Sequence, residues 1–461
     1  MDTVTLVGAG IVNLITALEL ARHGYPVTVH DRAPDPRSAA HWTRYGCTRG
    51  GGDGRMFTLT EADTYHNRSR HPDGSSNGLL DRPISEHGWL LAEPGSLTEP
   101  ERHWAAEFQA MPPALAEIYN EDIFEVNREA GLRWTSLVSA EPELFGQETG
   151  YADGILRLYS EQEYLRWHLA RNDRVGATRR VLSPDQIASD YPALADACVN
   201  GTIAGGIEVV GFTVNIHRFV ARLLDLLEAE GVRFHWDSEV ARIRWKSPGI
   251  VDRLELSDGE ILHSRHYVLS LGAYGDDLLR GTEAHQLIQG MLGVWSTLPN
   301  VEPRLEHSLK IARNGHRAEE TNVTLATGSR GEPLLVCGSG YGWTGLQPDN
   351  IDASELEVLF DSLDDTLRRF FPQAHAAAEP LGASRQVCVR PWTASCLGIF
   401  ERVATAGGGS LIVTGGHNTG GFAQSPVVAE AVLASLEGRP HKMHERYDPR
   451  RYSPFISLRI T

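Results

Sequence analysis

The start of the chain contains the pattern that most restricts its fold. Residues 4–32 read VTLVGAGIVNLITALELARHGYPVTVHDR, in which an apolar run ends in Gly-Ala-Gly and a second apolar run ends at Asp31. The alternation of β-branched residues predicts a strand over 3–7, and the spacing of apolar residues predicts a helix over 11–23. A further strand is expected over 26–30. This order is typical of a βαβ unit that binds a dinucleotide.

The turn between the first strand and the helix offers a phosphate site. Gly8 permits the tight turn, and Gly10 lets a pyrophosphate approach the backbone amides at the positive end of the helix. Asp31 ends the second strand, where a carboxylate can bind ribose hydroxyls. The third fingerprint position is Asn13, which either loosens the packing of helix on strand or leaves an amide near the phosphates. The fingerprint alone leaves NAD and FAD open, although its place at the start of the chain favours FAD.

Size, charge and cysteine usage exclude several classes of protein. The chain has 461 residues, which favours two domains or one large α/β body with a second layer. A net charge of −17 argues against nucleic acid or an anionic membrane as partner. The five cysteines are widely spaced, which predicts neither a disulfide framework nor a metal site and favours the reducing cytoplasm. Without a run of about 18 apolar residues or a basic segment before the first strand, we expect neither a transmembrane helix nor a signal peptide.

The rest of the chain alternates helical and strand patterns. We expect helices over 215–230 and 353–371, a β-meander over 232–245 and 250–272, and mostly strands over 285–345. Neither a repeat nor a linker divides the sequence into two successive units. Two domains are therefore expected to be interleaved along the chain.

Later segments resemble those of one enzyme family. They are GGDGRMFTLTEADTY (51–65), DSEVARIRW (237–245), VLSLGAYGDDLL (268–279), CVRPWTASCLGIF (388–400) and IVTGGHNTGGFAQSPVVAEAVLASLEG (412–438). Together with the opening fingerprint, they resemble FAD-dependent amine and amino-acid oxidoreductases of the D-amino-acid oxidase, glycine oxidase and sarcosine oxidase superfamily. The two C-terminal segments are the most specific.

The resemblance implies an α/β fold with FAD as cofactor. It predicts a Rossmann-type FAD-binding domain interleaved with a mixed β-sheet substrate domain, the two-domain architecture of p-hydroxybenzoate hydroxylase-like flavoproteins. The FAD-binding domain is expected to comprise residues 1–90, 150–280 and 380–461. The substrate domain is expected to comprise residues 91–149 and 281–379.

The resemblance also implies cofactor contacts at particular positions. In the family a glycine-rich turn passes over FAD and delivers an arginine near the flavin ring, and Arg55 matches that arginine. Val240 matches a valine whose backbone touches adenine, and the glycine-rich turn before the last long helix is expected to face the flavin. The expected cofactor-binding residues are Gly8, Gly10, Ile11, Asn13, Asp31, Arg32, Thr48, Gly54, Arg55, Val240, Gly272, Cys388, Gly416, His417, Gly420, Gly421 and Phe422.

Arg390 and Arg55 are the predicted catalytic residues. Arg390 matches the arginine that clamps the substrate carboxylate through two parallel hydrogen bonds, and the alternative is a surface arginine before a proline turn. Arg55 is expected to stabilise reduced flavin or assist oxygen, unless it contacts phosphate or solvent. Cys388 either matches the cysteine that bonds covalently to flavin in the sarcosine oxidase branch or is a small thiol in a strand. That branch also activates oxygen with a lysine. Residues 287–296 match the strand that carries it, but Gln289 stands where a cation is expected; Lys310 is a candidate substitute, the alternative being a solvated lysine.

The implied reaction is oxidation of the C–N bond of a small amine or amino acid to an imine, with oxygen as acceptor giving hydrogen peroxide. One alternative is a flavin dehydrogenase that passes electrons to a quinone or another carrier. Others are an NAD(P)-dependent dehydrogenase with the same fingerprint and a non-catalytic FAD-bound scaffold. The expected partners are the substrate and oxygen or another electron acceptor, with neither nucleic acid nor membrane. Substrate identity and oligomeric state stay open.

Overall fold

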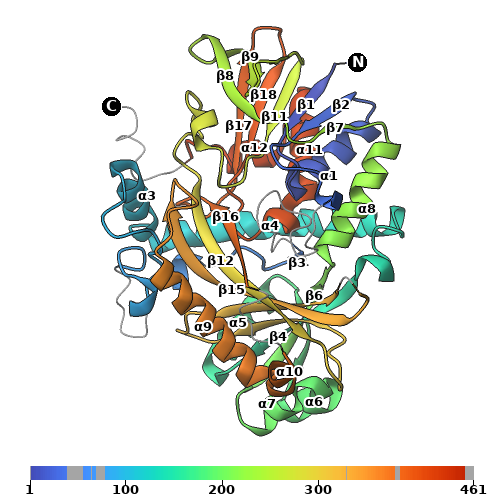
Figure 1. Ribbon diagram of the computed structural model, residues 1–461, viewed down its shortest axis with the longest axis vertical. Helices are drawn as coiled ribbons and strands as arrows, with labels where there is room; N and C mark the ends of the chain where they lie inside the picture. Colours follow the sequence, from blue (N-terminus) through green and yellow to red (C-terminus); the bar gives the residue numbers. More distant parts are fainter. Residues whose placement is uncertain are drawn as a thin grey trace.

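Two β-sheets organise the chain, one toward each end of an elongated molecule (Figure 1). The computed structural model describes residues 2–38, 55–63, 65–68, 78–328, 330–378 and 385–451. Each sheet draws strands from the first and the second half of the sequence. This arrangement confirms the predicted fold class, a Rossmann-type α/β unit interleaved with a mixed sheet. The predicted domain boundaries stay a prediction.

The first sheet contains the expected βαβ unit. Its strand order is β10 (Ile261–Leu262), β9 (Ile250–Leu256), β17 (Ile399–Thr405), β18 (Ser410–Gly415), β11 (His266–Leu269), β1 (Val4–Val7), β2 (Val27–His30) and β7 (Arg233–His235), with β8 (Val240–Ser247) paired to β9. The strands from β18 to β7 run parallel to one another. Helix α1 (Ile11–Arg22) connects β1 to β2, so the glycine turn lies at the carboxyl end of the central strand. In open parallel sheets this edge is where ligands bind.

The second sheet is mixed. Its strand order is β16 (Gln386–Trp392), β12 (Gln289–Pro299), β15 (Pro333–Gly345), β14 (Glu320–Thr327), β13 (Ser308–Ala312), β4 (Ala152–Tyr159), β6 (Gly205–Thr213) and β3 (Met56–Thr58), with β5 (Thr178–Leu182) paired to β6. All of its pairs are antiparallel except β13 with β4. Helices α9 (Ala353–Phe370) and α10 (Pro372–Ala377) cover one face. Leu359, Leu363 and Leu367 of α9 are buried there because they recur at helical spacing.

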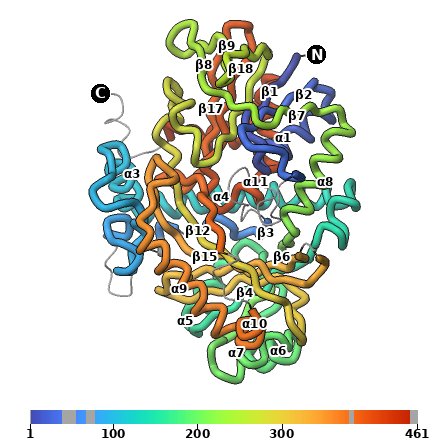
Figure 2. The backbone as a smooth tube through the Cα atoms, in the orientation of Figure 1, coloured from blue at the N-terminus to red at the C-terminus, as the bar shows by residue number. Residues whose placement is uncertain are grey.

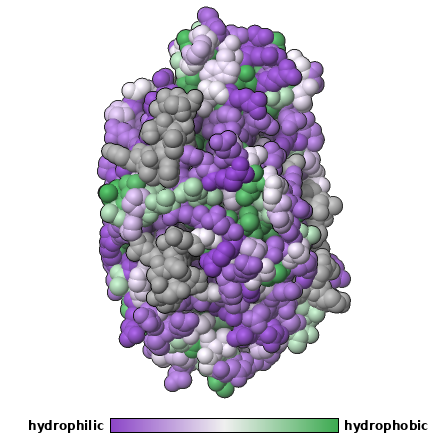
Figure 3. Space-filling view, turned by 90° about the vertical axis from the view of Figure 1, so that its left-hand side faces the viewer, coloured by the Kyte–Doolittle hydropathy of each residue, from purple (hydrophilic) through white to green (hydrophobic). Residues whose placement is uncertain are grey.

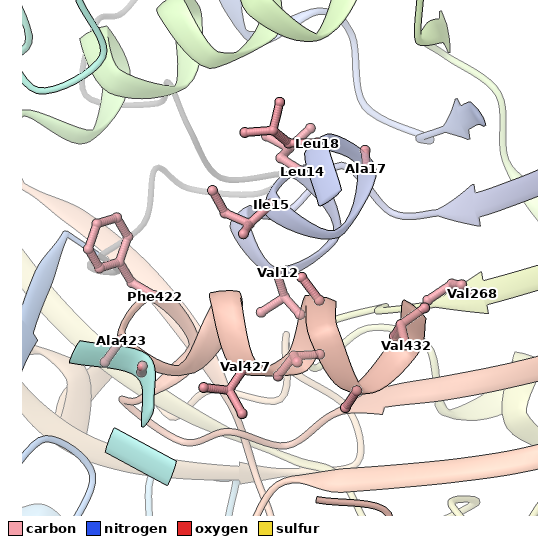
Figure 4. Packing of buried hydrophobic residues seen from close by; sticks show 14 of the residues in the cluster. Val12, Leu14, Ile15, Ala17, Leu18, Val268, Phe422, Ala423, Val427 and Val432 are labelled. Atoms are coloured by element: carbon pink, nitrogen blue, oxygen red, sulfur yellow. The ribbon is translucent and has the colours of Figure 1, made fainter. Parts of the chain in front are cut away.

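Helix α1 packs against a helix from the last part of the described sequence, beside the first sheet. Helix α11 (Gly421–Leu436), red in Figure 2, packs against the blue α1. Figure 4 shows Val12 and Ile15 of α1 facing Phe422 and Val427 of α11. Helix α11 also contacts β18, β3 and α4 (Pro113–Ala140). It is therefore buried on nearly all sides, which agrees with its largely apolar sequence. Each fully buried valine, isoleucine or phenylalanine side chain in this contact contributes about 1.5–3 kcal/mol to the free energy of folding.

The remaining helices lie around these layers. They are α2 (Tyr65–Arg68), α3 (Glu99–Gln109), α5 (Gln162–Arg174), α6 (Pro184–Asp190), α7 (Ala195–Val199), α8 (Ile216–Ala229) and α12 (Lys442–Arg446). In the part of the chain that the structure describes, none of the helices combines the length and apolarity needed to cross a bilayer. The face shown in Figure 3 is largely hydrophilic with scattered apolar side chains.

Candidate active site

A cleft lies between the two sheets. One wall is formed by the glycine turn at the start of α1, by residues 270–274 after β11, and by the segment leading into α11. The opposite wall is formed by side chains of β13, β14, β15 and β16. Of the predicted site residues, eight line this cleft, namely Gly10, Ile11, Gly272, Cys388, Arg390, His417, Gly421 and Phe422. The structure therefore brings residues from distant parts of the sequence to one place.

The turn before α1 is shaped for close approach of a ligand. Gly8 has φ +95° and lies against the carbonyl oxygen of Ser270, so a side chain at position 8 has no room. A Cβ at Gly10, in contrast, would meet no atom within 4 Å. Gly10 precedes α1 without a side-chain cap, and the first turn of α1 carries no acidic residue. The backbone amides in the first turn of α1 are thus available to an anion such as a pyrophosphate.

Asp31 and Asn13 hold this turn in place. The carboxylate of Asp31 is buried, its Oδ2 accepting from the amide of Ala9 at 2.6 Å and its Oδ1 from the amide of Ala33 at 2.8 Å. Burial raises the pKa of Asp31, against the opposing effect of these two amides. Nδ2 of Asn13 donates to the carbonyl oxygens of Val7 at 2.9 Å and Gly8 at 2.8 Å. The residue at the third fingerprint position therefore ties the helix to the turn.

The other predicted contacts of the nucleotide lie around the same edge. The guanidinium of Arg32 lies 5.2 Å from the ring centre of Tyr274, which lines the cleft. Gly272 has φ +62° and open space where a Cβ would stand. Val240 is buried at the first position of β8. Two further predicted contacts, Thr48 and Gly54, lie outside the described residues.

The segment before α11 makes a second helix start in the cleft. Gly416 has φ +65°, and a Cβ there would lie 2.5 Å from Cγ2 of Thr393, while one at Gly420 would lie 2.9 Å from Cβ of Ala62. Helix α11 has neither a side-chain cap nor an acidic residue in its first turn. Burial lowers the pKa of His417 to about 4, so this imidazole is neutral at neutral pH. Two uncapped helix starts in one cleft fit the two electron-rich parts of FAD, its pyrophosphate and its N1–C2=O edge.

Arg390 is held rigidly in the opposite wall. The side chain is 8% exposed, and its Nη2 donates to the carbonyl oxygen of Gly340 at 2.6 Å. The guanidinium lies 5.1 Å from the ring centre of Tyr341. It also occupies the space above Gly293, where a Cβ would lie 2.9 Å from its Cζ. Nε of Arg390 is buried without a hydrogen-bond partner among the described residues. A buried donor of this kind is suited to a carboxylate ligand.

Cys388 and Arg55 occupy different positions relative to the cleft. Cys388 lines the cleft from β16, on the same face of the strand as Arg390 because the two are separated by one residue. Arg55 is buried immediately before β3, its Nη2 donating to the carbonyl oxygen of Val336 at 3.4 Å. Its guanidinium lies 5.7 Å from the ring centre of Trp295. The residue after it, Met56, lines the cleft, whereas Arg55 itself does not. The roles predicted for both residues stay predictions.

The cleft wall carries a charged cluster of which the sequence had suggested only Lys310, as the candidate substitute for a lysine that activates oxygen. Nζ of Lys310 lies 3.1 Å from Oε2 of Glu320 and 3.6 Å from Oε1 of Glu61, and all three side chains are buried in the cleft wall. Burial lowers the pKa of Lys310, but the two carboxylates more than offset this and hold its pKa above the ordinary value. The hydroxyl of Tyr341 donates to Oε2 of Glu320 at 3.2 Å. A lysine inside the apolar run SLKIA was the sequence signal for this cluster.

Comparisons with known proteins agree with this geometry. The family model described as FAD dependent oxidoreductase matches residues 3–435. A D-amino acid dehydrogenase from Methylobacterium sp. (strain 4-46) is 26% identical over 470 residues, covering 97% of this chain and 99% of the relative. The crystal structure of glycine oxidase from Geobacillus kaustophilus superposes with a TM-score of 0.64 at 16% identity, covering 98% of this chain and 99% of that one. Iminodiacetate oxidase from Chelativorans sp. BNC1 gives a TM-score of 0.60 at 16% identity, covering 97% and 98%.

Proposed function

The chain belongs to the family of FAD-dependent oxidoreductases, and we propose that it oxidises the C–N bond of a small amino acid to an imine, with oxygen as acceptor. FAD is its cofactor, and the nicotinamide alternative does not fit this family. Gly10, Gly272 and Gly421 would border the cofactor, since all three line the cleft. Bound FAD supplies an acceptor for the hydride of the substrate.

The observation that carries the substrate proposal is the buried guanidinium of Arg390 in the cleft wall. Its Nη2 already donates to the carbonyl oxygen of Gly340. Its Nε has no partner among the described residues, so this group can donate to a further acceptor. A carboxylate bound there would be fixed by charge-assisted hydrogen bonds, which also fix the neighbouring α-carbon. The name of the 26% identical relative, a D-amino acid dehydrogenase, supports the same substrate class.

The reaction removes two electrons and two protons from the substrate. The α-C–H bond breaks with transfer of a hydride, the amine loses a proton, and a C=N bond forms. Water then hydrolyses the imine to a keto acid and ammonia. The chain's own part is to bind the carboxylate, to exclude water with the aromatic residues around Tyr341, and to orient the α-carbon.

The proposed acceptor is dioxygen, which takes two electrons and two protons to become hydrogen peroxide. Lys310 in the cleft wall is the candidate for a group that acts on oxygen, but Glu61 and Glu320 already counter its charge, so the ammonium alone does not favour oxygen over another acceptor. The second candidate is a dehydrogenase that passes the electrons to a quinone or another carrier. It is favoured by the name of the relative from Methylobacterium.

The test is anaerobic reduction of the purified holoenzyme, followed at the flavin absorbance near 450 nm, a value typical of flavins in general. We expect bleaching by at least one member of a panel of D- and L-amino acids and their N-methyl derivatives. Arg390→Ala should raise the half-saturating concentration, while the exposed Asn200→Ala serves as control. Admission of air then separates the acceptors, because an oxidase recovers its colour with release of peroxide, whereas a dehydrogenase needs an added dye. If no amine bleaches the flavin, the proposal fails.

A further inference from the structure

Besides the Arg390 guanidinium, the cleft holds hydrogen-bond acceptors that lack donors. Oε2 of Glu61 and Oδ1 of Asn322 are both buried, and neither has a partner among the described residues. Both residues line the same cleft as Arg390. Glu61 as a whole is only 4% exposed. Two buried acceptors without donors are costly unless a ligand supplies the donors.

Strand register places Asn322 beside the charged cluster. Lys310 of β13 lies directly opposite Asn322 of β14 on one side and Arg157 of β4 on the other. Residues opposite each other in a sheet point to the same face. Glu320 belongs to that face too, because it precedes Asn322 by two residues on the same strand. Asn322 thus belongs to one row of polar side chains on the sheet, and Glu61, in the turn after β3, meets this row at Lys310, 3.6 Å away.

The charges of this row already balance. Glu61 and Glu320 are countered by Lys310 at 3.6 and 3.1 Å and by the buried Arg157, which interacts electrostatically with both carboxylates. A third nearby carboxylate, that of Asp63, has its own partner in the guanidinium of Arg171 at 2.7 Å. A cationic or anionic group brought into the row would therefore leave one buried charge without a counterion, which is expensive. A neutral donor would satisfy the acceptors without that cost.

The row is joined to the carboxylate clamp by one side chain. The ring of Tyr341 lies under the Arg390 guanidinium, and its hydroxyl donates to Glu320. A single small molecule with a carboxylate at Arg390 can therefore extend along Tyr341 toward Glu61 and Asn322. We propose that the substrate carries, in addition to its carboxylate, an uncharged hydrogen-bond donor, a hydroxyl or amide N–H, which Glu61 and Asn322 accept. This inference rests on the proposed function, because it takes the Arg390 clamp as its starting point.

Binding of carboxylates that cannot be oxidised tests this substrate class. Titration calorimetry on the holoenzyme compares matched pairs in which a terminal hydroxyl replaces a methyl group: 3-hydroxypropionate with butyrate, 4-hydroxybutyrate with valerate, and 5-hydroxyvalerate with hexanoate. We expect at least one hydroxy acid to bind about tenfold or more tightly than its partner. Asn322→Ala should abolish that preference, whereas the exposed Asn200→Ala should keep it.

The other outcomes separate the two proposals. If the carboxylates bind but no hydroxy acid is preferred, the donor-bearing substrate is wrong while the Arg390 clamp stands. If 4-aminobutyrate binds more tightly than 4-hydroxybutyrate, the row accepts a cation and the argument from charge balance is overturned. If Asn322→Ala weakens valerate and 4-hydroxybutyrate equally, Asn322 acts on the fold of the cleft and the inference falls. If none of these acids binds the holoenzyme, the clamp itself is refuted.

Discussion

Gly293→Ala tests whether the position of the Arg390 guanidinium governs substrate binding. Gly293 of β12 pairs with Cys388 of β16, and the Arg390 side chain crosses over it. A Cβ at position 293 would lie 2.9 Å from Cζ and 3.3 Å from Nε of Arg390, and nearer still to Nη2. Since Nη2 is bonded to the carbonyl oxygen of Gly340 at 2.6 Å, the methyl group must displace the guanidinium from that bond. The substrate carboxylate then loses its fixed partner.

The size of the effect follows from the bonds that are lost. A hydrogen bond to a charged group contributes about 1.5–3 kcal/mol, which corresponds to roughly 10- to 150-fold in affinity. We therefore expect Gly293→Ala to raise the half-saturating substrate concentration by that factor in anaerobic flavin reduction, with a smaller change in the limiting rate. Gly407→Ala is the control, because Gly407 is exposed and a Cβ there meets no atom within 4 Å.

A double-mutant cycle shows whether the methyl group acts through Arg390. In an Arg390→Ala background the space beside position 293 is vacant, so Gly293→Ala should have almost no further effect on half-saturation. Flavin content and Tm are measured for all four proteins, which separates loss of the clamp from loss of the fold. The reasoning is refuted if Gly293→Ala binds substrate like the natural protein, or if its effect is as large without Arg390 as with it.

Three further changes have defined outcomes. Gly8→Ala should yield protein with little or no flavin absorbance. Position 8 has φ +95°, and a Cβ there would overlap the carbonyl oxygen of Ser270. Normal flavin content would contradict the role of this turn. Lys310→Met should lower Tm, since loss of one member of a buried ion pair costs about 3–5 kcal/mol. It should also slow the reoxidation of the reduced flavin by air, by a factor at least ten times larger than the factor by which it slows anaerobic reduction. Equal slowing of both steps would argue against a role toward oxygen. His417 has its pKa lowered by burial to about 4, so the unfolded chain binds a proton that the folded one does not between pH 4 and 6.5, and stability falls as pH drops through that window. His417→Gln should reduce this slope in urea titrations by about one proton, whereas the exposed Asn200→Ala should leave it unchanged.

The sequence predicted the elements whose patterns are local. The fingerprint predicted β1, α1 and β2, and the spacing of apolar residues predicted α8 and α9 to within a residue or two of their ends. These features depend only on neighbours along the chain, so a single sequence contains them.

The cleft was predictable only in part. Motifs led to Arg390, Cys388 and the glycines, because these stand in recognisable segments. Glu61 and Asn322 stand in ordinary strand and turn sequences, and only the pairing of β13 with β14 brings Asn322 beside Lys310. Strand pairing between distant segments cannot be obtained from periodicity, which reports the face of a strand and not its neighbour.

The packing of α11 on α1 has a consequence for how the protein acquires its cofactor in the cell. The fingerprint leaves the ribosome before Gly421 and Phe422, which line the same cleft from helix α11. The apolar side of α1 that Val12 and Ile15 present to α11 is uncovered until that helix has been synthesised. Contacts between such distant segments form late in folding. We therefore expect FAD to bind only after α11 has been synthesised, and a chain that stops before α11 to keep the dinucleotide fingerprint but expose the apolar side of α1, which limited proteolysis of such a truncated chain would detect.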